Sequence, residues 1–550
     1  MYQKDEIPQE CTASATQECH QVAPEQSAPP QQPEPPPPQR PTVWMPGILS
    51  TYSKCAAKLY DAAALHNSLF LVAGRVAKLT PEHGAKPIEL LTAVEAMSEF
   101  ERYVNFARLD KNGEQLQAIL TRDAADSLLN AAERVRLPKL HSVIRWPFLV
   151  VRNGKLVSLN PGFNPVEGIY VTGQSPVPEM PLEEATAVIT DVAMGEYLFV
   201  SQADKSRAIA AFLTPAFVIG RLLAGHAAVT LVEADHSQSG KGFLVKLFEA
   251  ANGERGTYLS KRTGGVGSLD ESFDSALVSG RPIVVFDNLR GRLDSQMVES
   301  FVTKMQHSCR VPYSKPVDID PSRYILYMTS NGVELTPDMA NRVSLVRIRK
   351  RRAHAFRKYP EGLIDRHVAA NTPRFLGAIH SVVRAWYDKG QPRTDEGRHS
   401  FRMWAQTLDW IVQNIFQSAP LMDDHESLTT RLSRPGLGFV RQLAVKLEAA
   451  GRLGQDLRAT DLYNLAEETQ LEIPGMNPYG YDDESKGARQ VGRLMRRAFG
   501  EDRQLLLEEY TVEVDDAEPT ETSHHTNRTY CFQRTEGVPG AGLGNVQVPV

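Results

Sequence analysis

The segment from Ala227 to Phe243, AAVTLVEADHSQSGKGF, decides the fold class. An apolar run, AAVTLVEAD, leads into the loop SQSGKG, and the helical pattern FLVKLFEAAN follows. A strand, a Gly-containing loop with a lysine and a helix together suit nucleotide phosphates, because backbone N–H groups at the helix N-terminus face the anion. The segment therefore predicts a phosphate-binding loop between a buried strand and a helix.

Two positions of this loop depart from the pattern G-x-x-x-x-G-K-[ST]. Asp235 stands where the first glycine is expected, and Gly242 replaces the hydroxyl residue that normally ligates Mg²⁺. The competing interpretation is a Gly/Ser turn that contains a lysine. On the first interpretation, the ATP-binding residues are Asp235, Ser237, Gln238, Ser239, Gly240, Lys241, Gly242 and Phe243.

Two further apolar runs, RPIVVFDNL and RYILYMTSN, end in polar residues and alternate with helical patterns, which is typical of a parallel α/β sheet. Ligands bind beyond the carboxyl ends of such strands, so these ends should face one site. Asp287 is placed to hold Mg²⁺ and Asn331 to orient a water near the terminal phosphate. Arg342 suits transition-state charge on a neighbouring subunit's nucleotide. The expected catalytic residues are Lys241, Asp287, Asn288, Asn331 and Arg342.

In this order the motifs resemble those of AAA+ ATPases of the superfamily 3 helicase type, which include polyomavirus large T antigens and helicases of phages and integrative elements. SQSGKG resembles their Walker A loop, IVVFDN Walker B, MTSN sensor 1 and ANR the arginine-finger segment. The resemblance covers roughly residues 138–416. It implies a homohexameric ring that hydrolyses ATP with Mg²⁺ and translocates on single-stranded DNA in replication of a phage or mobile element.

The resemblance also implies a DNA-contacting hairpin between Walker B and sensor 1. The corresponding stretch is CRVPYSKPVDIDPSR, which makes Lys315, beside Ser314, the expected hairpin tip. A lysine there would contact phosphates without reading bases, and a solvent-facing loop lysine is the equal alternative. The sequence shows no paired-carboxylate signature of a primase, so a separate partner would prime.

Asn288 departs from the family pattern, because many members carry there a second acid that activates water. An Asn side chain cannot take a proton, so the base is an acid elsewhere, with Glu271 and Asp235 as guesses, or hydrolysis is slow. The alternative function is a nucleotide-gated DNA-binding initiator or regulator. A third possibility is an ATPase fold that binds no nucleotide, which would show no thermal shift with ATP.

The C-terminal region reads as three helices followed by a strand pair, the order of a winged helix. Its third helix, SKGARQVGRLMRRAFG, would lie in the major groove of duplex DNA. The basic residues of this helix are Lys486, Arg489, Arg493, Arg496 and Arg497, and Val491, Leu494 and Ala498 hold the opposite, core face. A winged helix that contacts proteins is the alternative. The run from Arg342 to Lys358 has eight Lys/Arg and no acid, and its first part, VSLVRIRK, alternates like a strand leaving the core with charges on one face. A solvated charged face is the usual interpretation of such a run, and in a ring ATPase contact with DNA phosphates is comparably plausible.

Composition limits the classes of function. Lys+Arg 61 against Asp+Glu 66 gives a net charge of -5, which excludes an overall basic coat for nucleic acid but allows local patches. The chain is 42% hydrophobic, as in soluble globular proteins, and it has no run of eighteen apolar residues. Five scattered cysteines predict no disulfide framework. We expect a cytoplasmic protein without membrane contact.

The 550 residues divide, by these patterns, into seven segments. We expect a disordered Pro-rich tail (1–50), a mostly helical N-terminal domain (51–137) whose function is open, and a strand-rich and helical linker (138–220). The AAA+ core (221–360), a helical subdomain (361–430), a winged-helix DNA-binding domain (431–536) and a disordered tail (537–550) follow. The fold class is therefore α/β, a P-loop ATPase with a parallel sheet, preceded by a mixed α+β region and followed by a winged helix.

Overall fold

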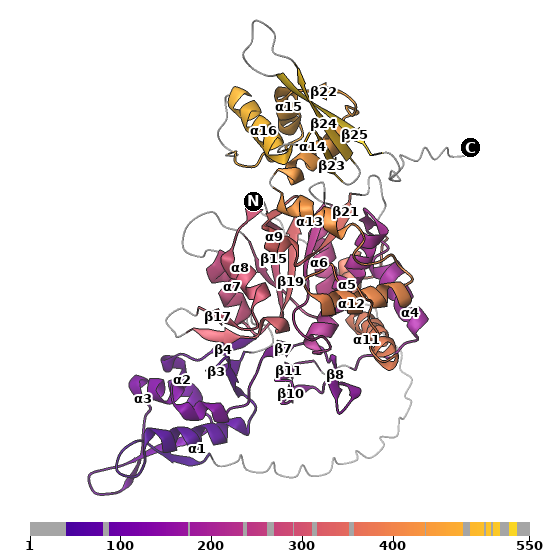
Figure 1. Ribbon diagram of the computed structural model, residues 1–550. Coiled ribbons are helices and arrows are strands. Elements are labelled where there is room, and N and C mark those ends of the chain that lie inside the picture. The colour runs from indigo at the N-terminus through magenta and orange to yellow at the C-terminus, as the bar shows by residue number, and fades with distance from the viewer. Residues whose placement is uncertain are drawn as a thin grey trace, which may run out of the picture.

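The computed structural model describes most of the chain between residues 40 and 535. The described ranges are 40–80, 87–173, 176–234, 239–260, 269–289, 291–310, 316–350, 357–434, 436–476, 484–499, 502–507, 510–517 and 527–535. They form an N-terminal unit, a central α/β unit and a C-terminal unit, which Figure 1 shows from bottom to top. Within these ranges, no helix has the length and apolar character needed to cross a membrane.

A six-stranded sheet lies at the centre, in the order β12-β21-β13-β19-β15-β14. Its strands are β12 (Leu198–Phe199), β13 (Val229–Ala234), β14 (Thr257–Leu259), β15 (Ile283–Leu289), β19 (Ile325–Ser330) and β21 (Val343–Arg349). Neighbouring strands pair in parallel, except for the edge strand β12. The predicted parallel sheet is therefore confirmed, with its three apolar runs as β13, β15 and β19. These strands are covered on both faces, which explains their continuous apolar sequence.

Helices cover both faces of this sheet, and alternation along each strand decides which helices a side chain meets. Val232 and Tyr327 face one hydrophobic core, and their neighbours Leu231 and Met328 face the other. The first core contains residues of α4 (Leu182–Ala187), α5 (Gln202–Ile219), α6 (Lys241–Ala251), α10 (Ile364–Ala370), α11 (Thr372–Asp388) and α12 (Arg402–Asn414). The second contains residues of α7 (Leu269–Leu277), α8 (Gln296–Thr303), α9 (Pro337–Ala340) and α13 (His425–Ser433). The helices expected in a linker and in a separate helical subdomain thus pack on the same sheet as α6, which follows the predicted phosphate loop.

Short strands lie beneath the sheet and join the N-terminal unit to it (Figure 1). They are β7 (Ser142–Ile144), β8 (Leu149–Arg152), β9 (Lys155–Ser158), β10 (Gly162–Asn164) and β11 (Ile169–Val171). β8 and β9 form an antiparallel hairpin around Asn153 and Gly154, whose φ angles of 51° and 72° are both left-handed. Two-residue hairpin turns favour Asn-Gly because both positions need positive φ, so this dipeptide suits the turn that it forms.

The N-terminal unit contains more strand than the mostly helical domain that the sequence predicts. Its elements are β1 (Thr42–Trp44), α1 (Tyr52–Ala64), β2 (Leu69–Val72), β3 (Arg75–Leu79), β4 (Ile88–Leu90), α2 (Ala93–Phe100), β5 (Asn105–Leu109), β6 (Gln115–Gln117), α3 (Arg122–Leu129) and a 3₁₀ helix (Ala132–Arg136). β1 falls within the tail predicted over 1–50, yet it pairs with β5 and buries Val43 completely. These strands are too short to show a clear alternation, and pairing with distant segments decides them.

A hairpin of β17 (His307–Cys309) and β18 (Val317–Ile319) leaves the second face of the sheet. Asp274 fixes the base of this hairpin to α7: its Oδ1 lies 3.1 Å from His307 Nε2, and its Oδ2 accepts the Arg310 N–H at 2.7 Å. Asp274, His307 and Cys309 are all buried. The expected hairpin tip, Lys315 with Ser314, lies outside the described residues.

The C-terminal unit has a hydrophobic core of its own. It consists of α14 (Leu437–Ala449), β22 (Asp456–Leu457), α15 (Ala459–Glu468), α16 (Glu484–Phe499), β23 (Gln504–Leu507), β24 (Tyr510–Ala517) and β25 (Asn527–Arg534). The strands form an antiparallel sheet in the order β22-β25-β24-β23. α13, which contributes Leu428 and Leu432 to the central unit, ends at Ser433, so the boundary lies after this helix and not at residue 431.

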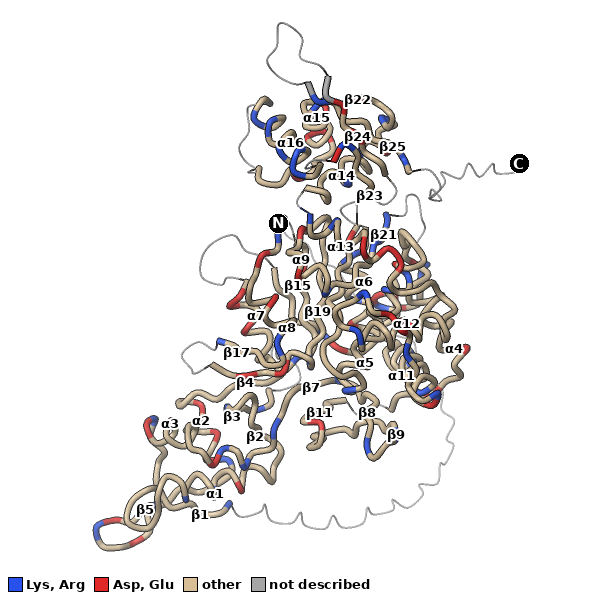
Figure 2. Tube along the Cα trace, viewed as in Figure 1, with Lys and Arg blue, Asp and Glu red and all other residues tan. Residues whose placement is uncertain are grey.

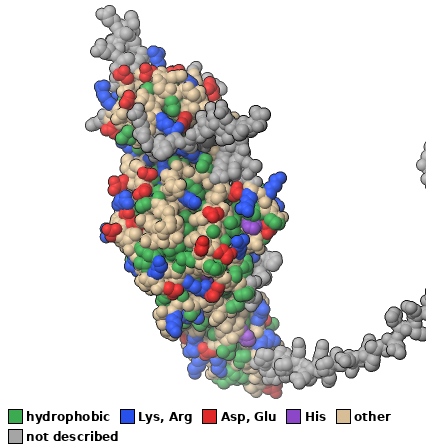
Figure 3. All heavy atoms as spheres, turned by 90° about the vertical axis from the view of Figure 1, so that its right-hand side faces the viewer, with side chains coloured by type: hydrophobic (Ala, Val, Ile, Leu, Met, Phe, Trp, Pro, Cys, Tyr) green, Lys and Arg blue, Asp and Glu red, His purple; other side chains and the backbone are tan. Residues whose placement is uncertain are grey.

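Charged side chains are mixed over much of the surface of the central unit. Figure 2 shows both acidic and basic positions among its helices. The face in Figure 3, which is the right-hand side of Figure 1, mixes both signs with hydrophobic side chains. No single-sign field covers that face of the described chain, so a basic surface for nucleic acid must be sought elsewhere.

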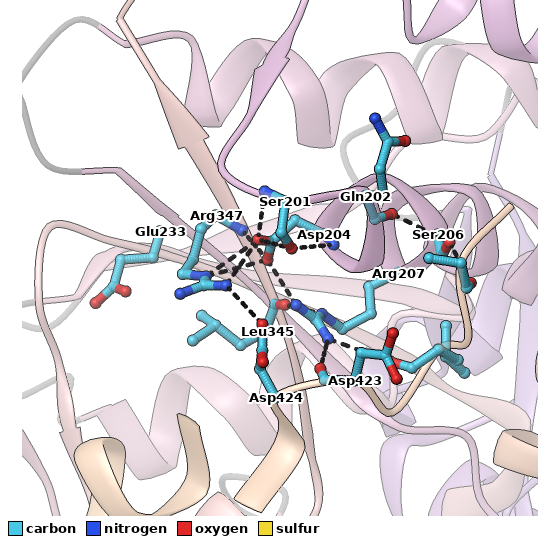
Figure 4. Close-up of polar contacts among 12 residues, drawn as sticks. Ser201, Gln202, Asp204, Ser206, Arg207, Glu233, Leu345, Arg347, Asp423 and Asp424 are labelled. Atoms are coloured by element: carbon cyan, nitrogen blue, oxygen red, sulfur yellow. Dashed lines mark hydrogen bonds and ion pairs between the residues drawn. The ribbon is translucent and has the colours of Figure 1, made fainter. Parts of the chain in front are cut away.

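A buried charge network fixes the N-terminus of α5 to β21 (Figure 4). Asp204 is fully buried and accepts hydrogen bonds from Arg207 Nη2 at 2.8 Å and from Arg347 Nη2 at 2.9 Å. The backbone N–H of Arg347 also donates to Asp204, at 3.0 Å. The interpretation of residues 343–350 as a strand leaving the core is therefore wrong: β21 lies inside the sheet, and Arg347 neutralises a buried acid.

Candidate nucleotide site and basic helix

The predicted phosphate loop connects the central strand β13 to α6. Asp235, Ser237 and Gln238 lie outside the described residues, and Ser239 and Gly240 lead directly into α6. Gly240 caps this helix with a φ of 92°, a conformation that glycine adopts without steric cost. The first N–H groups of a helix have no partner within the helix and suit an anion.

Lys241, the first residue of α6, reaches the end of the neighbouring strand. Its Nζ donates a hydrogen bond to Oδ1 of Asn331, which directly follows β19. Parallel pairing sets Glu233 beside Ser330, so the loop and Asn331 both follow the carboxyl ends of their strands, on the same side of the sheet. The structure thus brings together the lysine and the amide that the sequence assigns to one site.

Asp287 also lies at the carboxyl ends of the strands, near the end of β15, and its side chain is partly exposed. Its Oδ1 accepts a hydrogen bond of 2.7 Å from the hydroxyl of Thr329. The same hydroxyl accepts the N–H of Asn288 at 2.8 Å. Carboxylate oxygens are ligands that Mg²⁺ prefers, so Asp287 fits the metal that accompanies ATP.

Asn288 is exposed and has a φ of 54°, a left-handed conformation that Asn tolerates better than most residues. Its carboxamide offers no proton acceptor for an attacking water. Glu271, one of the two acids suggested as a base, is exposed in the first turn of α7, and the other, Asp235, lies outside the described residues.

The remaining loop positions are open to solvent or ligand. A Cβ added at Gly242 would meet nothing within 4 Å, so this glycine is not required by packing. The Phe243 side chain is 49% exposed, and Lys246 Nζ lies 5.6 Å from its ring centroid. Neither side of the helix start at Gly242 and Phe243 is therefore closed by packing of the described residues.

Sequence reasoning missed a buried ion pair directly beneath the loop. Glu233, in the second-last position of β13, accepts hydrogen bonds from Arg431 Nη1 at 3.1 Å and Nη2 at 2.5 Å. Both side chains are 4% exposed, and Arg431 comes from α13. The available signal was an acid within an otherwise apolar strand, since a buried carboxylate requires a partner. The pair fixes the point at which β13 enters the phosphate loop.

Arg342 lies at the amino ends of the parallel strands, whereas the loop of its own chain follows the carboxyl end of β13. Its carbonyl oxygen accepts the N–H of Val229, the first residue of β13, at 3.0 Å. The loop follows Ala234, which is about 17 Å further along the strand at about 3.3 Å per residue. The Arg342 guanidinium donates to the Asp338 carbonyl. Within one chain, Arg342 therefore does not join Lys241 and Asp287.

The expected DNA-contacting side chains of α16 share its exposed surface. Lys486, Arg489, Arg493, Arg496 and Arg497 are all exposed, and Figure 2 shows basic positions along this helix. On the opposite face Val491, Leu494 and Ala498 are buried in the C-terminal core, as predicted. α16 lies against α15 at Gly487, where an added Cβ would come within 2.1 Å of the Tyr463 ring.

No protein-family model matches the chain, and no curated protein matches it. Among solved structures, the chain is similar to the apo A form of the NrS-1 C-terminal region, with 10% identity, a TM-score of 0.36, and coverage of 86% of this chain and 98% of that one. It is also similar to the active helicase Cch of SCCmec type IV, with 11% identity, a TM-score of 0.28, and coverage of 84% and 97%. At these values the function has to be argued from the site itself.

Proposed function

We propose that the protein is an ATP-dependent DNA helicase of the superfamily 3 AAA+ type, which acts as a hexameric ring in replication of a phage or mobile element. The observation that carries this proposal is the presence of three groups at the carboxyl ends of neighbouring parallel strands. Lys241 at the N-terminus of α6 donates to Asn331, and Asp287 lies at the end of the next strand. A lysine, an amide and a carboxylate beyond parallel strands suit phosphoryl transfer.

Each group would have one task in this reaction. The N–H groups at the start of α6, with the Lys241 ammonium, bind the phosphates of ATP. Asp287 holds Mg²⁺, which when bound neutralises charge on the phosphate oxygens. Asn331 exchanges its hydrogen bond with Lys241 for one to the attacking water. Asn288 takes no proton, so another acid completes the site.

Arg342 would act on the nucleotide of the neighbouring subunit. Its position at the amino end of β13 supports this assignment. The phosphate loop of the same chain follows the other end of this strand, so Arg342 is too far away to contact it. A guanidinium from a neighbour stabilises charge in the transition state and couples turnover to ring assembly. ATP would therefore be hydrolysed only between subunits.

Two surfaces would contact DNA. We assign the C-terminal unit as a winged helix whose α16 binds duplex DNA, and its exposed basic face with a buried apolar face supports this assignment. The hairpin of β17 and β18 would contact single-stranded DNA in the ring channel through Lys315. Priming would fall to a separate partner.

The second candidate function is a nucleotide-gated DNA-binding initiator or regulator. Asn288 favours it, because the position after Asp287 offers no base. Gly242 favours it as well, because it removes a hydroxyl ligand of Mg²⁺. Such a protein would bind ATP and DNA but hydrolyse ATP slowly.

ATP hydrolysis with and without single-stranded DNA separates the two candidates. The helicase predicts turnover that DNA stimulates and that Lys241→Ala abolishes, and Lys246→Ala, an exposed lysine of the same helix, is the matched control. A thermal shift with ATP but no turnover would establish the gated DNA-binding protein instead. No thermal shift in the wild type would contradict both candidates.

The role of Arg342 has its own test. Arg342→Ala should keep the ATP-induced thermal shift and lower turnover by about 10³-fold or more. Mixing Arg342→Ala with Lys241→Ala subunits should restore part of the turnover, because some interfaces then combine an intact loop with an intact arginine. Loss of ATP binding in Arg342→Ala alone would contradict the assignment.

A further inference from the structure

The end of β15 contains a bulge beside the candidate metal ligand. Phe286 pairs with Met328 and Leu289 pairs with Ser330, so the two residues between them, Asp287 and Asn288, oppose only Thr329. Bulges occur next to active sites, where they redirect a side chain. A side chain that stabilises this bulge therefore also sets the direction of the Asp287 carboxylate.

The Thr329 hydroxyl stabilises the bulge in this way. Thr329 is 2% exposed, and its hydroxyl oxygen accepts the Asn288 N–H at 2.8 Å. Because a backbone N–H can only donate, the single hydroxyl hydrogen is left for Asp287 Oδ1, at 2.7 Å. One hydroxyl thus bridges both residues of the bulge, which a side chain without a donor and an acceptor on the same atom cannot do.

Thr329 also lies on the face of the sheet that carries the phosphate loop. Tyr327, two residues earlier on β19, packs in the core that contains α6, and alternation puts Thr329 and Asn331 on the same side. The end of one strand therefore directs a hydroxyl to Asp287 and an amide to Lys241.

We propose that Thr329 is a positioning residue for Mg²⁺. Its hydroxyl occupies Asp287 Oδ1, fixes the rotamer of the carboxylate and presents Oδ2 to the cation. This inference rests on the proposed nucleotide site, and it assigns to Thr329 a role that neither the motif pattern nor the resemblance gives it. Residues that hydrogen-bond to a metal ligand typically change metal affinity by about 10- to 100-fold when they are replaced.

Buried hydroxyls elsewhere in this sheet provide a matched comparison. Thr230 on β13 and Ser344 on β21 are 1% exposed, and neither hydroxyl has a hydrogen-bond partner among the residues that the structure describes. Thr230→Val therefore makes the same chemical change as Thr329→Val, in a neighbouring strand, without breaking a hydrogen bond.

The test is a Mg²⁺ titration of the full chain at a fixed ATP concentration, read as the ATP-induced thermal shift. Thr329→Val should raise the Mg²⁺ concentration for half-maximal shift by about 10- to 100-fold. Thr329→Ser, which keeps the hydroxyl, should restore the wild-type value within about threefold, and Thr230→Val should leave it unchanged. The thermal shift with ATP in excess EDTA should be the same for Thr329→Val and the wild type, because the loop and Lys241 are intact.

Thr329→Ala removes the hydroxyl without adding a methyl group to the bulge, so it gives the same readout if the valine variant does not fold. An unchanged Mg²⁺ requirement in the variants that lack the hydroxyl would overturn the proposal, as would an equal loss of ATP binding with and without Mg²⁺. A wild type that shows no shift with ATP would instead contradict the nucleotide site itself, so the two failures are distinguishable.

Discussion

The charge network around Asp204 provides a prediction whose size follows from the structure. Asp204 is fully buried, and its guanidinium partners on Arg207 and Arg347 are only 2% and 4% exposed. Asp204→Asn keeps the volume of the side chain but removes the negative charge, so two buried cations lose their common counter-charge. Arg207 keeps hydrogen bonds to the carbonyls of Leu345 at 2.6 Å and Asp423 at 2.9 Å, which softens the loss.

Removing one partner of a buried ion pair costs about 3 to 5 kcal/mol, because the remaining charge stays desolvated. For a unit of this size, about 2 to 4 °C of melting temperature corresponds to 1 kcal/mol, so we expect a decrease of about 6 to 20 °C. Asp424→Asn is the matched control, because Asp424 is 56% exposed and lies 3.8 Å from Arg347. An exposed ion pair contributes about 0 to 1 kcal/mol.

Calorimetry of the full chain at pH 7 measures both variants. Burial opposes ionisation of Asp204, but the charges of Arg347 and Arg207 outweigh it and hold the pKa of this carboxyl below its usual value. The stabilisation is therefore present above about pH 4, where the unfolded carboxyl ionises, and is lost as the pH falls through the lower pKa of the folded state. The difference between wild type and Asp204→Asn should be constant from about pH 5 to 8 and shrink in acid. A melting temperature of Asp204→Asn within 2 °C of the wild type at pH 7 would refute the reasoning.

Three further predictions concern the C-terminal unit and a buried acid. Arg493→Glu with Arg496→Glu should weaken duplex DNA binding and flatten the slope of log K against log salt by about 1.8, and an unchanged slope in a salt titration would mean that α16 contacts proteins. Gly487→Ala should destabilise the C-terminal unit by about 1 to 3 kcal/mol, because the new Cβ meets the α15 tyrosine at 2.1 Å. In the control Gly492→Ala the new Cβ would lie 3.6 Å from the Ala459 Cβ, an ordinary contact, so this variant should be as stable as the wild type or more stable. Equal melting temperatures of the two variants would contradict the packing of α15 against α16. Burial raises the pKa of Glu254 to about 8, so the folded state retains a proton that the unfolded state loses above about pH 4.5, and stability should fall as the pH rises from about 5 to 8. Glu254→Gln should lessen that fall in thermal melts, whereas parallel pH profiles would show that Glu254 is ionised in the fold.

Part of the candidate site was predictable because its signals are local. Apolar runs that end in Asp287 and Asn331, and a Gly-Lys pair before a helix, report buried strands and a helix N-terminus within a few residues. In the structure these strand ends lie side by side, because neighbouring parallel strands have their carboxyl ends on the same side of the sheet. The hairpin at Asn153 and Gly154 was equally local, since its turn chemistry lies in the dipeptide.

The sequence by itself determined the parallel sheet, the helix that begins at Lys241 after β13 and the two faces of α16, because each depends on short-range patterns. Only the tertiary structure decided that Arg347 is buried against Asp204, that Arg431 binds Glu233, and that Thr329 bridges the bulge at Asp287. These partners lie far apart in the chain, and an arginine or threonine in a strand carries the same local pattern whether it faces solvent or a buried acid. The free energy that selects between the two comes from desolvation and pairing in the packed interior, which exists only once the sheet and its helices have assembled.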